Sequence, residues 1–510
     1  MYPFLKPGDR LVVKPVPPNS LSVGDIIVLP QKTAHCFIIH RLVKKYPNGN
    51  GITKGDSLLQ SDSEQVELST VTGRVEATIR GRRFISISAG PRSHMKGLYA
   101  HLSLRCLTYE AIKLKAKNTL KQLLCINKTK ENQLERGFIL SILREGPPKV
   151  LPKLNWVKFS EIAYWEGVAG ILYLSLKGRD IPKFTLSTLE NYYCNTAYSN
   201  LIYVKALEEL EEALKKEKIV VMTLKGASML DHVYTRIGMR FMEDIDLMVH
   251  PNDWERFVRL LHRMGYREQG TFSHLFVKNK VAIDLHTHAL HTDRIKSREA
   301  LFPCGMGPLW EKAIPWKPGF QWLKRPDNAD HVLLLSQHLL QHSFSRLIWF
   351  EDIRRIMDQG NARFWEKLKN NSALFKQHKS LSYTLYLLNL LFKYEPPKDS
   401  GINALFENIS GSERMLLNMY GAGTKLNHLG VFLAFFSIPG FIERIRFGWE
   451  TIFPKNKVLQ EEFGVFSMCE RAFFYTIRFF QLINLLIKLI LSIPGIMIRS
   501  TRMEKLKEFK

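Results

Sequence analysis

The stretch "MRFMEDIDLMV", residues 239–249, joins an acidic cluster to an apolar run. Glu243, Asp244 and Asp246 stand almost side by side, and three apolar residues follow them. Carboxylates are rarely buried unless they are paired or hold a cation. Because strand side chains alternate between two faces, a strand here places Asp244 and Asp246 on the same face. The stretch therefore predicts a buried strand that carries two neighbouring carboxylates.

The sequences on both sides of this stretch predict further elements of an α+β core. "IVVMTLKG" (219–226) is a short apolar run that ends on Gly, as a buried strand does. "HPNDWERFVRLLHRMGY" (250–266) predicts a helix with Asn252 or Asp253 near its start and Gly265 at its end. "KVAIDLHTHAL" (280–290) begins as another apolar strand. The predicted order is strand, Gly turn, helix, strand, helix, strand.

Two carboxylates on one patch repel each other unless cations lie between them. Asp284, on the later strand, supplies a third carboxylate. Mg²⁺, or the similar Mn²⁺, takes oxygen ligands and is often shared with the phosphates of a nucleotide. Asp244, Asp246 and Asp284 are therefore our candidate metal ligands and catalytic residues for phosphoryl or nucleotidyl transfer by a pair of metal ions.

The Gly turn before the acidic stretch supplies candidate nucleotide-binding residues. Backbone amides of Gly226 and Ala227, at a strand-to-helix turn, are expected to hold a triphosphate. Lys225 and Arg240 lie nearby in the sequence and are expected to neutralise phosphate charge. A plainer alternative is a surface strand whose carboxylates are only solvated, since Asp-Ile-Asp by itself is common.

Taken together, "LKGASML", "MRFMEDIDLMV", the following "GY" and "VAIDLHTHAL" resemble the polymerase-β-type nucleotidyltransferase superfamily, and more narrowly the family of uncharacterised nucleotidyltransferases. The resemblance runs from about 131 to at least 360. It implies that Gly226 is the Gly of the nucleotide turn, Asp244 and Asp246 the metal-binding pair, and Asp284 the third carboxylate. The turn departs from the pattern, because it reads Gly-Ala where Gly-Ser is usual and stands farther from Asp244.

Two pairs of histidines lie near these motifs. His286 and His288 follow Asp284 at a spacing of two, and structural or supporting roles are expected for them. His338 and His342 are four apart in "SQHLLQHS", which suits one helix face, but the Glu of the HExxH zinc motif is absent. We interpret these two as residues that flank the site or pack beside it.

Residues 1 to about 90 predict a compact β unit of short strands: "RLVVKPV", "DIIVLP", "CFIIHRLV", "VTGRVEATI" and "RFISIS". "MYPFLKPGDRLVV", "VGDIIVL", "FIIHRLV" and "TKGDSLLQSD" resemble the S24/S26 peptidases, the fold of signal peptidases and LexA-type repressors. That resemblance implies His40 as general base, with Asp56 or Asp62 as its acidic partner. The Ser nucleophile of these enzymes precedes "M-x-P", and this chain begins at Met1, so we expect no peptidase activity unless translation starts upstream.

The composition limits the class of protein. A net charge of +25 favours an anionic partner such as nucleic acid, nucleotide phosphate or an anionic membrane. Six scattered cysteines predict neither a zinc knuckle nor a disulfide framework, and "MYPFLKPGDR" is no signal peptide, so a cytoplasmic setting is expected. The apolar run at 479–498 carries a polar stripe and a Pro-Gly break, which favours an amphipathic helix on a membrane or on the core.

The sequence thus predicts a multidomain protein. It comprises a small all-β S24/S26-like domain (1–94), a basic helical linker (95–130), a nucleotidyltransferase core embedded in a largely helical domain (131–360), and a helical C-terminal region (361–510). The expected reaction is Mg²⁺-dependent transfer of an NMP group from an NTP to an acceptor, which is left open between peptide, protein, RNA and metabolite. The alternatives are a signal-peptidase-type serine peptidase and a non-catalytic scaffold that binds nucleic acid or membrane.

Overall fold

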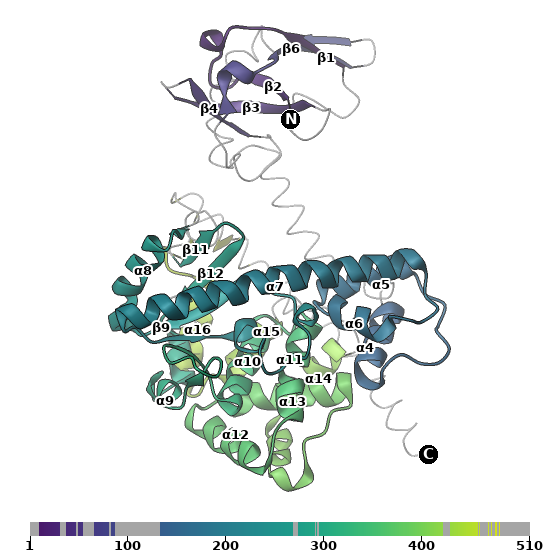
Figure 1. The fold of residues 1–510 in the computed structure, drawn as a ribbon, viewed down its shortest axis with the longest axis vertical. Coiled ribbons are helices and arrows are strands. Elements are labelled where there is room, and N and C mark those ends of the chain that lie inside the picture. Colours follow the sequence, from purple (N-terminus) through teal and green to yellow (C-terminus); the bar gives the residue numbers. More distant parts are fainter. Residues whose placement is uncertain are drawn as a thin grey trace. The chain divides into compact units, whose positions relative to one another are not determined.

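The computed structural model describes residues 10–30, 37–46, 49–54, 66–80, 83–86, 133–268, 274–290, 292, 295–421, 429–456, 458–459, 468, 471, 475, 476 and 479. The chain forms two compact units, Met1–Cys125 and Ile126–Lys510 (Figure 1). The linker expected at 95–130 lies outside the described residues, and so does the tail at 479–498 after its first residue. Asp56 and Asp62 lie outside them as well.

The first unit is an antiparallel β-sheet, as the spacing of short apolar runs and turn residues predicts. Its strand order is β1-β6-β2-β3-β4-β5, and β7 pairs with β6. The run in β2 is apolar on both faces, with Ile26 and Val28 in one cluster and Ile27 and Leu29 in another. The strands are β1 (Arg10–Lys14), β2 (Ile26–Pro30), β3 (Phe37–Lys45), β4 (Asn50–Lys54), β5 (Val66–Glu67), β6 (Gly73–Arg80) and β7 (Arg83–Ser86).

The second unit contains a mixed sheet in the order β10-β11-β12-β9-β8-β14-β13. The central strand β9 runs parallel to β12 and antiparallel to β8. All five residues of β9 are buried, which explains why its sequence is apolar apart from Asp246. The strands are β8 (Val221–Thr223), β9 (Ile245–Val249), β10 (Arg267–Glu268), β11 (Leu275–Lys278), β12 (Val281–His286), β13 (Ile314–Pro315) and β14 (Leu323–Arg325).

Two helices, α7 (Lys183–Glu217) and α8 (Trp254–Arg263), pack on this sheet and share one apolar core with it. The 35-residue α7 runs across the strands (Figure 1) and packs Leu207, Leu210 and Leu214 into a shared apolar cluster. The helix α8 ends as predicted at Gly265, whose φ of +91° suits a residue without a Cβ. Buried Glu211 of α7 also accepts backbone N–H groups from three residues around the start of β14.

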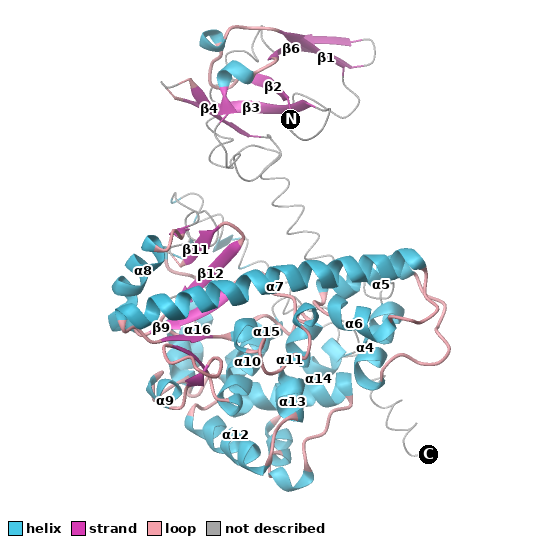
Figure 2. Cartoon of the chain, in the orientation of Figure 1, coloured by secondary structure: helices cyan, strands magenta, loops and turns pink. Residues whose placement is uncertain are grey.

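Helices make up most of the remainder (Figure 2) and share a second, larger apolar core. This confirms the helical periodicity read in the sequence before and after the sheet. The helices are α4 (Gln133–Glu145), α5 (Trp156–Trp165), α6 (Ala169–Leu176), α9 (Gly307–Glu311), α10 (Asn328–Gln341), α11 (Leu347–Asp358), α12 (Ala362–Leu374), α13 (His378–Phe392), α14 (Gly411–Gly421), α15 (Leu429–Ser437) and α16 (Phe441–Ile452). In the part of the chain that the structure describes, each helix is too short or too polar to span a membrane.

One predicted element is wrong: the Gly turn after β8 does not lead into an α-helix. Short 3₁₀ turns at Lys225–Ser228 and Ile237–Met239 take its place. The hydroxyl of Ser228 donates to the carbonyl of Thr223 at 2.7 Å, and the indole of Trp316 donates to the carbonyl of Ala227 at 2.8 Å. Such side-chain bonds compete with the α-helical pattern, so the segment becomes an irregular loop that runs to the acidic stretch.

Candidate active site

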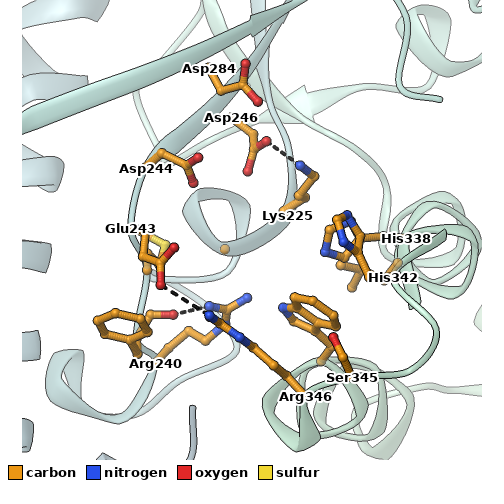
Figure 3. A pocket seen from close by; sticks show the side chains of 15 residues that line it. Lys225, Arg240, Glu243, Asp244, Asp246, Asp284, His338, His342, Ser345 and Arg346 are labelled. Atoms are coloured by element: carbon orange, nitrogen blue, oxygen red, sulfur yellow. Dashed lines mark hydrogen bonds and ion pairs between the residues drawn. The ribbon is translucent and has the colours of Figure 1, made fainter. Parts of the chain in front are cut away.

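The three predicted aspartates meet beside two parallel strands. In the pairing of β9 with β12, Asp246 lies directly opposite Asp284. Asp244 precedes β9 rather than lying within it, yet its carboxyl group faces the same space as the other two (Figure 3). Asp246 is buried, with 5% of its surface exposed, while Asp244 and Asp284 are half-buried. The structure therefore brings together residues that are up to 40 positions apart in the sequence.

Polar side chains of α7 hold the loop that carries Asp244. The amide of Asn200 donates to the carbonyls of Ile237 and Arg240, at 2.7 and 2.8 Å. The hydroxyl of Tyr203 donates to the carbonyl of Glu243 at 3.0 Å. Because Asn200 and Tyr203 are themselves buried in α7, this irregular loop has fixed anchors next to the start of β9.

His286 of β12 is a fourth member of the cluster. Its Nε2 lies 3.2 Å from Oδ1 of Asp246 and 3.2 Å from Oδ2 of Asp284. Asp246, Asp284 and His286 each offer a ligand atom, and these atoms all lie within 4.8 Å of one another. From the sequence we expected only a structural or supporting role for His286, because the pairing of β12 with β9 that brings it to Asp246 cannot be read from local sequence. His288, by contrast, accepts the backbone N–H of Leu290 at 3.1 Å, which is structural.

Lys225 supplies positive charge to the cluster. Its Nζ lies 2.5 Å from Oδ1 of Asp246, and its backbone adopts a left-handed φ of 48°. Burial raises the pKa of Asp246, but Lys225 and His286 lower it by more, so the net pKa is below the usual value. For Asp244, burial and the charge of Asp246 raise the pKa to about 7. The site is thus crowded with negative charge that a cation would stabilise.

Arg240 lines the same pocket, but its guanidinium forms an ion pair with a carboxylate of the helical domain. Its Nε and Nη2 donate to Asp352 of α11 at 2.9 and 2.8 Å, and both side chains are buried. The hydroxyl of Tyr234 donates to the same carboxylate at 2.5 Å. This arrangement attaches the loop before β9 to α11. The sequence, which suggested Arg240 for phosphate, did not show this partner.

Gly226 and Ala227 occupy different surroundings. Gly226 lines the pocket, and a Cβ on it would lie 2.4 Å from Sδ of Met242, so the loop passes Met242 closely at this point. Ala227 is buried with 1% of its surface exposed and does not line the pocket. Of the two predicted turn residues, the structure places only Gly226 at the site.

A pocket of about 450 Å³ opens in front of these carboxylates. Its second wall comes from α10, from α11 and from the turn between them. It includes His338, His342 and Arg346 (Figure 3), and also Trp349. The guanidinium of Arg346 lies 3.3 Å from the exposed carboxylate of Glu243, across the mouth. Burial lowers the pKa of His338 well below its ordinary value, so this imidazole is uncharged at neutral pH.

The sequence named His338 and His342 as neighbours of the site, and both line it. Arg346 and Trp349 were missed. The only signal for them in the sequence is their position four and seven residues after His342.

In the first unit, His40 lies half-buried on β3, opposite Ile27 of β2. Its predicted acidic partners lie outside the described residues, so the structure brings no peptidase-like set together around it among the residues that it describes.

Comparison with known proteins agrees with the geometry of the second unit. Residues 152–393 match the family model described as uncharacterised nucleotidyltransferase. The matched range includes the strands β8, β9 and β12, all three aspartates, and also α10 and α11. The match supports a nucleotidyltransferase and nucleotidyl transfer in general, with an NTP as substrate. No curated protein and no solved structure matched the chain.

Proposed function

We propose that the second unit transfers an NMP group from an NTP to an acceptor, with Asp244, Asp246 and Asp284 as its catalytic carboxylates. The observation that carries the proposal is the parallel register that sets Asp246 against Asp284 in a pocket which Asp244 also faces. Solvated surface aspartates, the plainer alternative, need no such convergence and would not be buried beside a lysine.

The donor atoms fit a divalent cation. Three carboxylates supply the oxygen ligands that Mg²⁺ and Mn²⁺ prefer, and the ligand atoms of Asp246, Asp284 and His286 lie close enough to share one ion. A bound Mg²⁺ would neutralise the charge that develops on the phosphates during transfer. Nε2 of His286 lies 3.2 Å from a carboxylate oxygen of each of Asp246 and Asp284, so this ring helps to orient both carboxylates.

In this proposal the side chains of the pocket prepare an in-line displacement at the α-phosphorus. The acceptor hydroxyl oxygen forms a bond to the α-phosphorus, the bond from that phosphorus to the bridging oxygen breaks, and pyrophosphate leaves. Asp284 takes the hydroxyl proton. Lys225, already beside Asp246, moves its ammonium to the phosphate oxygens.

A labelling experiment tests this function. The full chain is incubated with each α-³²P-labelled NTP and Mg²⁺ in a cell lysate, and the label retained on macromolecules and metabolites is measured. We expect transfer that EDTA abolishes and that Mg²⁺ or Mn²⁺ restores. Asp246→Asn should lower transfer by about 100-fold or more, because metal-ion stabilisation of charge contributes several kcal/mol.

The matched control is Asp253→Asn, the same change at the start of α8, where the carboxylate faces solvent and bonds Arg256 at 2.7 Å. This variant should keep full activity. Equal transfer by wild type and Asp246→Asn would instead favour the non-catalytic scaffold.

For the first unit we propose the S24/S26 fold and a role in binding a partner. Its support is the antiparallel sheet, with the half-buried His40 on a strand where that family has its base. A fluorophosphonate probe, which labels activated serines, should leave the full chain unlabelled. Labelling that His40→Ala removes would favour the peptidase alternative.

A further inference from the structure

The pocket wall that faces the carboxylates contains three heteroaromatic rings. The rings of His338 and His342 lie 4.4 Å apart between centroids, and Trp349 lies 4.6 Å from the first and 5.3 Å from the second. All three side chains line the pocket, and Figure 3 shows both histidines directed into it. The wall therefore offers a continuous aromatic surface beside a strongly charged one.

A strained turn brings these rings together. Between α10 and α11 the consecutive residues Ser343 and Phe344 both adopt left-handed backbones, with φ of 53° and 58°. Such residues are uncommon without glycine, and each costs about 1–3 kcal/mol. The surroundings hold them in place: Ser343 accepts the backbone N–H of Gly430 at 3.0 Å, and Tyr420 donates to the carbonyl of Phe344. Backbone strain of this kind clusters at binding and catalytic sites.

The ring nitrogens of His338 and His342 make no side-chain hydrogen bond to the part of the chain that the structure describes. Their backbones are hydrogen-bonded, but neither ring has a hydrogen-bond partner among the described residues, although each ring carries one donor and one acceptor when neutral. These nitrogens therefore remain available to a ligand in the pocket.

We infer that the rings of His338, His342 and Trp349 form the subsite for the base of the nucleotide. The inference rests on the function proposed above and extends it: Lys225 and the carboxylates take the phosphate end, while this wall takes the heteroaromatic end. A base is planar, stacks on aromatic rings and presents donors and acceptors at its edge. The volume of about 450 Å³ falls within the usual range for small-molecule sites.

Phosphate is the rival occupant of this wall. It is disfavoured because the wall is aromatic and carries no cation other than Arg346 at its edge, which is already paired with Glu243 among the described residues. Burial keeps His338 uncharged, so it would not attract an anion as an imidazolium would.

Calorimetric titration distinguishes the contribution of the base to binding from the contribution of the phosphates. The full chain is titrated at low temperature with each of the four Mg²⁺–NTPs and with Mg²⁺–tripolyphosphate, which has the phosphates but no base. In the wild type at least one NTP should bind more tightly than tripolyphosphate. Trp349→Leu should weaken that NTP by between about 5- and 150-fold, as loss of one stacking contact does, and leave tripolyphosphate unchanged.

Three further variants make the result specific. Trp349→Phe keeps a ring and should retain most of the affinity. His342→Ala, at an exposed position, should weaken the NTP alone without affecting folding. Trp165→Leu is the matched control, since Trp165 is 68% exposed and does not line the pocket, and it should change nothing.

The outcomes distinguish this inference from the proposed function. Tripolyphosphate binding as tightly as every NTP would overturn the inference while the transferase remains. Equal weakening of NTP and tripolyphosphate in Trp349→Leu would also overturn it and assign the wall to phosphate. A wild type that binds none of the probes, with no transfer of label, would remove the proposed function as well.

Discussion

Replacing Asp352 by Asn should strongly destabilise the second unit and loosen its pocket. Asp352 is fully buried on α11 and accepts three hydrogen bonds from Arg240, at 2.9, 3.1 and 2.8 Å, and one from Tyr234. Asn keeps the shape of Asp but removes the charge, and its amide nitrogen cannot accept a hydrogen bond. The guanidinium of Arg240, itself 5% exposed, would then be a buried cation without its counterion.

The expected loss follows from the geometry of this pair. Breaking one side of a buried ion pair costs about 3–5 kcal/mol, because the remaining charge can neither be solvated nor leave. Removal of both charges should cost much less, so Arg240→Met with Asp352→Leu should recover most of the stability. The matched control is Asp358→Asn on the same helix. Its side chain is 44% exposed and lies 3.2 Å from Arg354, so its change should stay within about 1 kcal/mol.

Urea denaturation followed by the helical circular dichroism signal measures these differences, because most helices belong to the second unit. Mg²⁺-dependent binding of an NTP gives a second readout, since Arg240 anchors the loop that precedes Asp244. The reasoning is refuted if Asp352→Asn and Asp358→Asn shift the unfolding midpoint equally. It also fails if the double replacement is less stable than Asp352→Asn.

Three other changes test the packing around the site. Gly170→Ala should cost about 2 kcal/mol or more, since a Cβ there would lie 2.1 Å from the backbone carbonyl of Gly238; thermal unfolding measures this. His331, which is fully buried, has its pKa lowered to about 3 by burial, so its contribution to stability is complete above about pH 6.5 and declines as the pH falls towards 3. It should lose roughly 2 kcal/mol between pH 6.5 and 5, and His331→Asn should flatten that part of the stability profile. Glu211→Gln should lower the urea midpoint. The change removes the charge that strengthens the 2.6 Å hydrogen bond from the N–H of Leu323, and it places the NH₂ group of Gln beside backbone N–H groups that need an acceptor.

Local patterns in the sequence predict the strands of the site well and its loops poorly. The apolar run with alternating carboxylates identifies β9, and the resemblance adds Asp284 on a later strand. Both are local signals, since a strand needs only its own apolar residues to be recognised. The loop after Gly226 is different. Its conformation depends on Trp316, which lies about 90 residues away in the sequence. The indole N–H of Trp316 donates a hydrogen bond to the carbonyl of Ala227. No local pattern reports such a partner.

Charged residues show the same limit. Lys225 and Arg240 look equivalent in the sequence, as two cations near an acidic strand. In the structure Lys225 forms an ion pair with Asp246 inside the pocket, whereas the guanidinium of Arg240 forms an ion pair with Asp352. The difference arises from α11, more than 100 residues later, and a charge pattern cannot reveal which carboxylate comes closest.

The helix α11 links the stability of this unit to the recognition of its ligand. Asp352 and Trp349 are three residues apart on that helix, so they rotate and shift as one body. Asp352 holds the loop that precedes Asp244, and Trp349 packs against the two histidines of α10. The acidic wall and the aromatic wall of the pocket are therefore joined through one rigid element. We therefore expect the buried pair of Arg240 and Asp352 to help set the distance between the two walls, which the proposed nucleotide would span.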